Sequence, residues 1–445
     1  MESLQYLVMI AQLILGLSIL VGIHEAGHMV AAKFFGMRVE KFSIGFPPKL
    51  FAFKKGETEY SIGAIPLGGF VKITGMVDES LDTAKLNEEP KPYEFRAKPA
   101  WQRLIVMLGG IIMNVITGIV VFIMLTFING STYISKDELN KNGIVAYELG
   151  EEIGLKTGDK VLKVNGHDFD RFTELMNPNY LLADKSYYTI QRNGETMDIT
   201  IPGNLIEELS DQNSNKGFID VYRPFLVDRV INKTGAEEAG LEKGDKIIEV
   251  AGNDVQYFHQ LKRVLEDNRG KKVDIKVLRG KENQKQIILT DVQVSEDATI
   301  GFYPEWQLNT SSIDYTFAEA IPLGTKRAFE VVWVNVKAFG KMFKGELDPT
   351  KSLRGPIGIL QEFGGTWDWT RFWTLTGLLS MVLAFMNLLP IPALDGGHVT
   401  FLLYEIVSGR KPSDQFLENA QKVGMVILLM LMVFVFANDI INLFP

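Results

Sequence analysis

The sequence His24-Glu25-Ala26-Gly27-His28 follows directly on an uncharged stretch of 21 residues, Ser3–Ile23. Histidines four residues apart lie on one face of a helix, so both imidazoles can reach one metal ion. The glutamate between them is placed to act on a water molecule held at that ion. Because ionisable side chains in an apolar helix are costly, they mark candidate functional sites. The alternative is a helical turn whose two histidines pair with water.

A metal ion that does chemistry needs a third protein ligand and an open position for water. The preferred candidate is Asp395 in NLLPIPALDGGH, residues 387–398, where two prolines and two glycines exclude a regular helix. Such backbone is tolerated at membrane depth only when it is buried in protein or lines a wet cavity. His398 is the competing ligand, and an ordinary turn aspartate in a loop is the third interpretation. Asp395 is preferred because the histidine pair lacks an oxygen ligand.

Four uncharged stretches predict four membrane-spanning helices. They are Ser3–Ile23, Leu104–Asn129, Phe372–Leu394 and Val423–Asn438, of 21, 26, 23 and 16 residues. The first three reach the roughly 20 residues that cross a hydrocarbon layer about 30 Å thick, and the fourth must extend past Asp439 to do so. A buried core helix is the alternative for each. The predicted fold class is a polytopic α-helical membrane protein.

The composition narrows the possible chemistry. The chain has 445 residues, no cysteine, 5 histidines and a formal net charge of −8. Without cysteine there are no disulfides, no thiolate metal ligands and no cysteine nucleophile. An acidic chain does not suit a nucleic-acid partner, because phosphate binding needs a basic surface. We therefore expect no nucleic acid among the partners.

The charges that flank the spans predict an orientation in the membrane. Basic residues such as Lys33 lie at one set of span ends, and acidic residues such as Asp368 lie near the other. By the bias of basic residues toward the cytoplasm, residues 34–103 and 405–422 face the cytoplasm. Residues 130–370 then lie on the outer side of the membrane.

The segment between the second and third spans repeats itself. GLKTGDKVLKVNG, residues 154–166, matches GLEKGDKIIEVAG, residues 240–252, at an offset of 86. Each copy predicts a turn with glycine torsions, an alternating strand and a second tight turn. The pattern resembles a tandem of bacterial PDZ domains, an α+β module outside the membrane. Their strands at Gly143–Tyr147 and Arg229–Ile231 would take up a peptide or chain terminus as an added strand.

The HExxH element, the NxxPxPxLDG element and the PDZ-like pair together resemble the site-2 protease family of intramembrane zinc metalloproteases, in its bacterial regulator-of-sigma-E branch. The resemblance implies Zn²⁺ held by His24, His28 and Asp395, with Glu25 activating water. It implies substrates that are single-pass membrane proteins trimmed beforehand, such as anti-sigma factors or leftover signal peptides. It also implies a bacterial inner-membrane location, with the active site toward the cytoplasm and the PDZ pair in the periplasm.

The same resemblance suggests residues that bind substrate. Gly56–Gly75 alternates and resembles the family's membrane-associated β-hairpin, whose edge, with Gly68 and Gly69, would clamp an unwound substrate strand. An ordinary cytoplasmic hairpin is the alternative. Asn387 would hydrogen-bond the substrate backbone. Asn114 belongs to an element that resembles the family's Gly-x-x-x-Asn motif. In an apolar helix it must find a polar partner inside the helix bundle. It is the last of the substrate-binding candidates.

The predicted domains follow from these features. They are a first span with HExxH (1–35), a hairpin region (36–100), a second span (101–129), two PDZ domains (130–221 and 222–308), a linker with an amphipathic helix (309–370), a third span with NxxPxPxLDG (371–409) and a fourth span (410–445). The linker helix has an apolar stripe interleaved with lysines, so it lies in the membrane interface or packs under the PDZ pair.

Three functions fit a membrane chain with these motifs. The first is intramembrane proteolysis by a zinc enzyme. The second is a catalytically degenerate, membrane-anchored PDZ scaffold, which would have no reason to keep Glu25. The third is a metal-ion transporter, because broken helices and intramembrane acids also mark transport. Four spans without an inverted repeat argue against transport.

Overall fold

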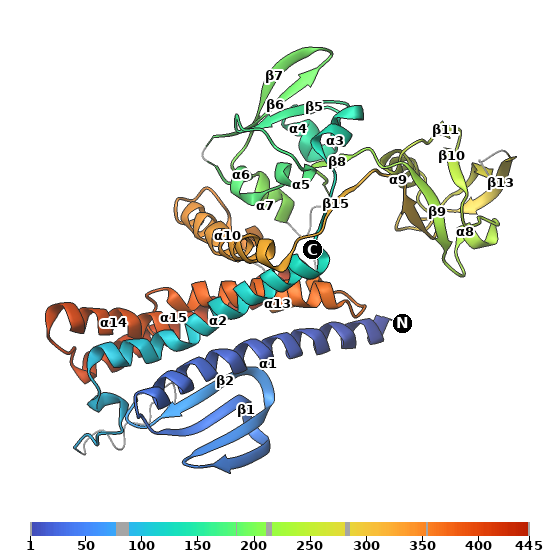
Figure 1. The fold of residues 1–445 in the computed structure, drawn as a ribbon. Helices are drawn as coiled ribbons and strands as arrows, with labels where there is room; N and C mark the ends of the chain where they lie inside the picture. The colour runs from blue at the N-terminus through green and yellow to red at the C-terminus, as the bar shows by residue number, and fades with distance from the viewer. Residues whose placement is uncertain are drawn as a thin grey trace. The chain divides into compact units, whose positions relative to one another are not determined.

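A computed structural model describes residues 2–76, 89–183, 185–210, 216–280, 285–352 and 355–443. The chain forms two compact units, one made of Met1–Ser131 and Ile313–Pro445 and the other of Thr132–Ser312. The first, here called the membrane unit, contains among its described residues four helices long and apolar enough to cross a membrane. The second, here called the β unit, holds most of the short strands (Figure 1). Part of the predicted hairpin region, residues 77–88, lies outside the described residues.

The membrane unit is mainly helical. Its elements are α1 (Glu2–Phe34), β1 (Val39–Lys55), β2 (Thr58–Ile73), a 3₁₀ turn (Phe95–Ala97), α2 (Ala100–Asn129), α10 (Phe317–Phe343), α11 (Pro349–Ser352), α12 (Pro356–Phe363), α13 (Trp369–Leu388), α14 (Asp395–Ser408) and α15 (Asp414–Leu443). The four candidate spans are α1, α2, α13 and α15.

Two of these helices differ in length from the uncharged stretches that predict them. The third span ends as a helix at Leu388, and α14 begins at Asp395. The chain between them cannot stay helical because it contains Pro390 and Pro392. The candidate span in α15, Gln415–Ile441, extends past Asp439 as expected, and it also begins earlier than the uncharged stretch.

Helix α2 lies at the centre of the membrane unit and packs against α1, α10, α13 and α14 (Figure 1). Glycine permits the closest of these approaches. A Cβ at Gly27 of α1 would lie 2.2 Å from the carbonyl oxygen of Gly109 of α2, so neither helix tolerates a side chain there. This backbone contact brings α2 against the HExxH segment.

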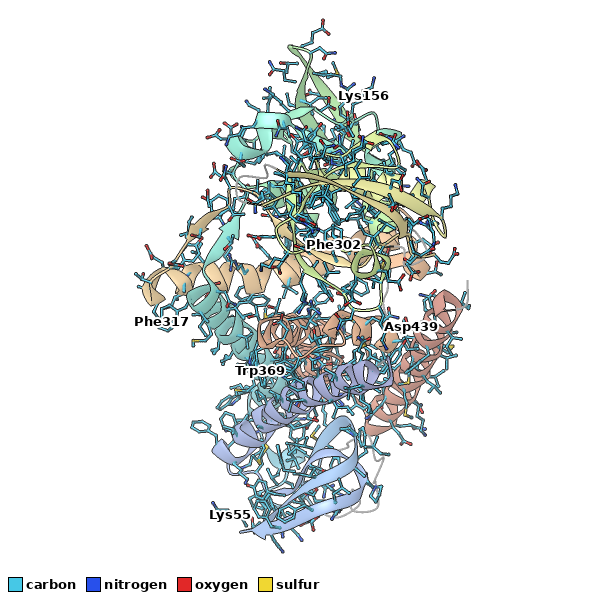
Figure 2. The ribbon with its side chains drawn as sticks, turned by 90° about the vertical axis from the view of Figure 1, so that its right-hand side faces the viewer. Lys55, Lys156, Phe302, Phe317, Trp369 and Asp439 are labelled. Atoms are coloured by element: carbon cyan, nitrogen blue, oxygen red, sulfur yellow. The ribbon has the colours of Figure 1, made fainter. Side chains whose placement is uncertain are left out.

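The strands β1 and β2 form an antiparallel hairpin that doubles back on itself. The first part of β1 pairs with both ends of β2, since Lys41 is opposite Glu59 on one side and Lys72 on the other. Residues 69–73 therefore form an edge, and no other strand in the described ranges pairs with it. Figure 2 shows Lys55 at the far tip of the hairpin. The edge, not the tip, adjoins α1, because a Cβ at Gly69 would touch Val21.

The linker helix α10 spans Phe317–Phe343 and packs on the membrane helices (Figure 2). Its Arg327 Nη1 donates to Thr126 Oγ1 of α2 at 2.9 Å, and a Cβ at Gly324 would meet the backbone of Ile123. Near the end of α15, the Asp439 carboxylate accepts hydrogen bonds from the backbone N–H groups at the start of α12. A buried carboxylate so paired needs no ion.

The β unit contains short strands and short helices. Its strands are β4 (Ile144–Ala146), β5 (Lys160–Val164), β6 (Ser186–Arg192), β7 (Glu195–Ile201), β8 (Ile219–Val221), β9 (Phe225–Val230), β10 (Lys246–Val250), β11 (Asn253–Asp254), β12 (Lys272–Arg279), β13 (Lys285–Gln293) and β14 (Phe302–Trp306). Its helices are α3 (Lys136–Asn142), α4 (Glu148–Glu152), α5 (Phe172–Leu175), α6 (Pro178–Leu181), α7 (Leu205–Ser210), α8 (Gly235–Glu238) and α9 (Phe258–Asp267). Strands β3 (Ser131–Tyr133) and β15 (Ser311–Ile313) stand where the chain enters and leaves the unit.

The two matching sequence segments begin equivalent turns in the β unit. The carboxylate of Asp159, 2 % exposed, receives two hydrogen bonds of 2.7 and 2.6 Å from Arg192. Asp245, 0 % exposed, receives two of 2.7 Å from Arg279. In both copies a buried aspartate thus holds the start of one strand (β5 or β10) to the end of the next (β6 or β12).

Candidate metal centre

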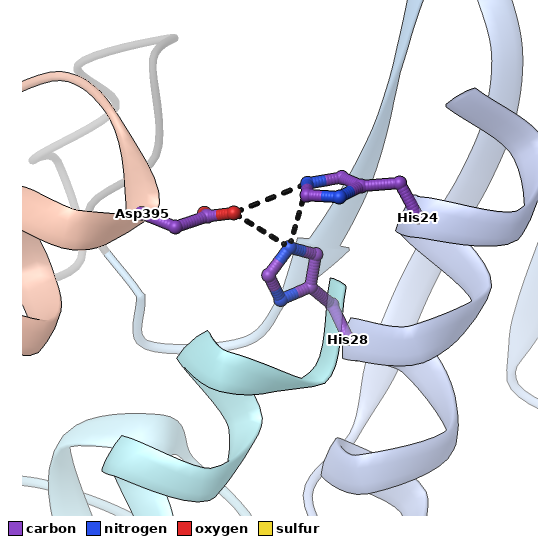
Figure 3. Close-up of side chains that lie close together, drawn as sticks. All are labelled: His24, His28 and Asp395. Carbon is purple, nitrogen blue, oxygen red and sulfur yellow. Dashed lines mark hydrogen bonds and ion pairs between the residues drawn. The ribbon is translucent and has the colours of Figure 1, made fainter. Parts of the chain in front are cut away.

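The two histidines of the HExxH element project from the same face of α1, as their spacing predicts. Their Nε2 atoms lie 3.2 Å apart, and His28 is 6 % exposed (Figure 3). The lone pairs of two ring nitrogens this close repel each other unless at least one nitrogen carries a proton or both face a cation. The geometry therefore presents two nitrogen donors to one point.

The third side chain at this point comes from the start of α14. Asp395 is the first residue of that helix, and its Oδ2 lies 3.1 Å from His24 Nε2 and 3.4 Å from His28 Nε2 (Figure 3). The broken backbone before it requires glycine at Gly396, where a Cβ would lie 2.2 Å from the carbonyl oxygen of Leu389. This tight turn aims the carboxylate back toward α1.

These three side chains fit a zinc ion. Zinc bonds of about 2.0–2.1 Å in a tetrahedral arrangement place neighbouring ligand atoms about 3.3 Å apart. The three separations here are 3.1, 3.2 and 3.4 Å. Asp395 Oδ2 is also buried and lacks a hydrogen-bond partner, which is costly unless a cation neutralises it. Among the described residues, these three form the one group of histidines and acids close enough to share an ion.

Helix α2 supplies no ligand but contacts both histidines on their outer nitrogens. His28 Nδ1 lies 2.8 Å from the carbonyl oxygen of Val106, so Nδ1–H donates there and Nε2 keeps its lone pair. His24 Nδ1 lies 3.2 Å from the amide of Asn114, whose Oδ1 is buried without a partner. Exchanging the two ends of this amide lets His24 Nδ1–H donate to Oδ1, which again frees Nε2 for a metal.

Glu25 lines the same cavity, of about 690 Å³, as the three candidate ligands. It is half-buried and does not belong to the ligand group. The β2 edge lines the cavity beside Glu25, since a Cβ at Gly69 would lie 3.4 Å from Glu25 Cγ. A carboxylate beside a three-ligand metal site, with an open edge strand facing it, suits hydrolysis of an extended peptide.

The other sequence-predicted residues fall around this cavity. Gly68, Gly69 and Asn387 line it, and Asn387 Nδ2 lies 3.4 Å from His24 Nε2. Asn114 also lines it, but it is 1 % exposed and its amide contacts His24. Asn114 thus contacts a candidate ligand, and its contact with substrate stays a prediction. His398, the competing ligand, lines the cavity without joining the ligand group.

Two contributors to the site were not assigned a role from sequence. The carbonyl of Val106 orients His28, and a backbone oxygen carries no sequence signal. Gly110 allows the close approach of α2, since a Cβ there would lie 2.4 Å from His28 Nε2 and 2.5 Å from His24 Cε1. The signal for Gly110 was present, because it is the glycine of the Gly-x-x-x-Asn element that ends at Asn114.

Comparisons with known proteins show the family of the chain. The model of Peptidase family M50 matches residues 12–431. A putative zinc metalloprotease of Treponema pallidum is 28% identical over 98% of this chain and 99% of its own length. The regulator of sigma E protease of Haemophilus influenzae is 25% identical over 99% of this chain and all of its own length. The regulator of sigma-E protease RseP of Salmonella typhimurium is 27% identical over 97% of this chain and 98% of its own.

Four apolar helices around a centre that fits zinc define the class of the protein, a membrane zinc metalloprotease. Within that class, the chain belongs to peptidase family M50, the site-2 proteases. The family assignment removes transport as an alternative for the chain as a whole.

Proposed function

We propose that the chain cleaves single-pass membrane proteins within the bilayer, after their outer domains have been removed. Anti-sigma factors and leftover signal peptides are the substrate types that the sequence resemblance implies. The observation that carries the proposal is the convergence of His24, His28 and Asp395 beside Glu25, at the edge strand of the hairpin. A degenerate scaffold would not need this complete set.

In the proposed mechanism His24, His28 and Asp395 hold the zinc. The bound ion would polarise the scissile carbonyl and lower the pKa of a water molecule toward about 7. Glu25 takes a proton from the attacking water and returns it to the leaving nitrogen, so that water and the amide bond become a carboxylate and an amine. Asn387 donates a hydrogen bond to the substrate backbone.

Substrate must be unwound before this chemistry, because a transmembrane helix satisfies its own carbonyl groups. The edge at residues 69–73 offers backbone donors and acceptors beside Glu25 and the candidate ligands. A substrate strand that pairs with this edge exchanges its helical hydrogen bonds for strand bonds at the point of cleavage. The glycine at Gly69 lets the hairpin backbone come close to α1.

The β unit is proposed to be the tandem PDZ module, placed on the outer side of the membrane, with residues 34–103 in the cytoplasm. Both copies contain the buried Asp–Arg pair. Helical structure follows β5 and precedes β6 in the first copy, as it follows β10 and precedes β12 in the second. An outer module of this kind would exclude substrates that still carry a bulky outer domain. Replacing residues 132–312 by a short linker should let untrimmed reporters be cleaved; unchanged selection would remove the gating role.

The proposed function is tested with a single-pass reporter in membranes. Glu25→Gln should bind zinc as the wild type does and lose cleavage by roughly 10²–10⁴-fold, the usual contribution of a general base. Zinc content measured on the same samples separates loss of the base from loss of the metal. Cleavage by Glu25→Gln at the wild-type rate would refute the assignment.

A further inference from the structure

A second cavity, of about 340 Å³, adjoins the cavity of the metal centre. The two cavities share four lining residues, Met76, Ala393, His398 and Gln421. The two cavities are therefore neighbours that meet at these four residues. The volume of the second cavity is at the small end of ligand pockets, roughly 300–1,000 Å³, which suits side chains better than a whole helix.

The walls of the second cavity are mainly apolar. Rings and aliphatic groups come from the 3₁₀ turn before α2, from α14 and from α15, and include Phe95, Phe401, Leu402 and Leu417. Such walls favour an apolar occupant, because each buried CH₂ contributes about 0.8 kcal/mol.

The charged side chains at the walls have partners, and these include Lys411, which also lines the cavity. Arg103 Nη2 donates to Glu405 Oε1 at 2.5 Å, and Arg96 Nε donates to Glu94 Oε2 at 2.7 Å. Glu418 accepts from Lys422 at 2.7 Å. Since these charges already have partners, the cavity does not select an ion or a charged side chain.

The hairpin edge leads from the metal centre to this cavity. Residues 68–73 line the catalytic cavity, and Gly75 and Met76, just beyond the end of β2, line the second one. A strand that pairs with the edge advances about 3.3 Å per residue and turns alternate side chains to one face. A substrate strand that continues past Gly75 would therefore run beside the second cavity, with its alternate side chains on one face.

We propose that the second cavity is a specificity subsite that takes up one large apolar side chain of the substrate, such as Leu or Phe. The proposal rests on the protease function given above and names the substrate feature that this function would select. Leu417 of α15 is a wall residue that can be changed without touching the candidate ligands or Glu25.

The first experiment changes the size of the cavity. Leu417→Trp fills it, Leu417→Ala enlarges it, and Leu403→Trp is the matched control, since Leu403 lies on α14, is 47% exposed and does not line the cavity. Single-pass reporters carry Ala, Leu, Phe or Trp at each position near the cleavage site in turn. Zinc content and thermal unfolding are measured on each variant, so that misfolding is recognised.

The wild type should prefer Phe over Ala at one position by several-fold in kcat/KM. Leu417→Trp should abolish that preference, because it should lower kcat/KM for the Phe reporter more than for the Ala reporter, Leu417→Ala should shift the preference toward Trp, and Leu403→Trp should behave as the wild type. Equal loss on all reporters, or no position with a preference, would overturn the subsite. Absence of cleavage by the wild type would refute the protease function instead.

A second measurement does not depend on catalysis. A small photoreactive diazirine residue close to leucine in size, at position 417 or 403 in the Glu25→Gln background, is illuminated in membranes that contain the reporter. Position 417 should capture the reporter through a single residue near the cleavage site, and position 403 should not. Equal capture from both positions, or none from 417, would contradict the subsite.

Discussion

Asp245 of the β unit and Asp395 of the membrane unit are both carboxylates taken largely out of water, but their surroundings differ. Asp245 accepts two hydrogen bonds from Arg279 and one from the backbone N–H of Glu242. Asp395 faces two imidazoles, and its Oδ2 has no hydrogen-bond partner. The chain supplies a complete set of donors in the first case and leaves the set incomplete in the second.

The difference separates a structural carboxylate from a metal ligand. A buried charge is costly unless it is paired and hydrogen-bonded, so a buried carboxylate oxygen that faces two imidazoles without a hydrogen-bond donor fits a site that a cation completes. Asp439 belongs with Asp245, because backbone N–H groups of α12 satisfy it. Burial of an acid in an apolar helix is therefore not sufficient to assign a metal ligand. The lack of hydrogen-bond donors to its carboxylate is the feature that indicates one.

The largest effect that tests this comparison is expected at Asp395. Asp395→Asn should lower zinc affinity by at least about 100-fold, because loss of a ligand exceeds the 10–100-fold cost of losing an orienting partner. Stability of the metal-free protein should not fall, since the change removes a buried charge. Chelator competition and thermal unfolding without zinc measure the two quantities. Marked destabilisation of the metal-free form would place Asp395 with Asp245.

Asp245→Asn should have the opposite pattern. It removes one of the two carboxylates that pair with the guanidinium of Arg279, since Glu242 remains, and the loss of these charged hydrogen bonds costs about 2 kcal/mol. Hydrogen exchange at β10 and β12 should accelerate, while zinc affinity stays at the wild-type value. Asp254→Asn, at an exposed position of the same sheet, is the matched control and should change neither quantity.

A smaller effect is expected at Asn114, which orients His24 without binding the metal. Asn114→Leu should lower zinc affinity by about 10–100-fold, the usual range for a partner of a ligating histidine. Asn335→Leu, in α10, removes an amide whose hydrogen bond stays within its own helix, and it should leave zinc affinity unchanged. Equal zinc affinity in the wild type and Asn114→Leu would show that the contact with His24 is incidental.

The smallest effect is expected at an exposed ion pair of the β unit. Lys136 Nζ donates to Asp168 Oδ1 at 2.9 Å, and this hydrogen bond lowers the pKa of Asp168. A lowered pKa stabilises the fold above the unfolded value of about 3.9, and the contribution is lost as pH falls through the folded pKa. Asp168→Asn should therefore lower the unfolding temperature slightly at pH 7 and not at pH 2. If the difference in unfolding temperature between the wild type and Asp168→Asn grew as the pH fell, it would contradict this role of Asp168.

Much of this site follows from sequence because its chemistry is local. The spacing of His24 and His28 fixes their common face, and the prolines after Leu389 predict the break before Asp395. That Asp395 meets a helix more than 350 residues earlier in the chain follows from the need for a third ligand and from the family resemblance. Residue spacing alone would not give that contact.

Other contacts could not be predicted, for physical reasons. A carbonyl such as that of Val106 is present at every position, so no residue type marks it. The partner of Asp439 is likewise the backbone of α12. The two Asp–Arg pairs of the β unit did carry a signal, since Arg192 and Arg279 recur at nearly the same distance after the repeated Gly-Asp.

The zinc content of the purified protein tests the central claim most directly. After dialysis against a weak chelator, the wild type, Glu25→Gln and His398→Ala should each retain about one zinc per chain. Asp395→Ala and His28→Ala should retain almost none. Full occupancy in Asp395→Ala, or its loss in His398→Ala, would contradict the account and give the third ligand position to His398.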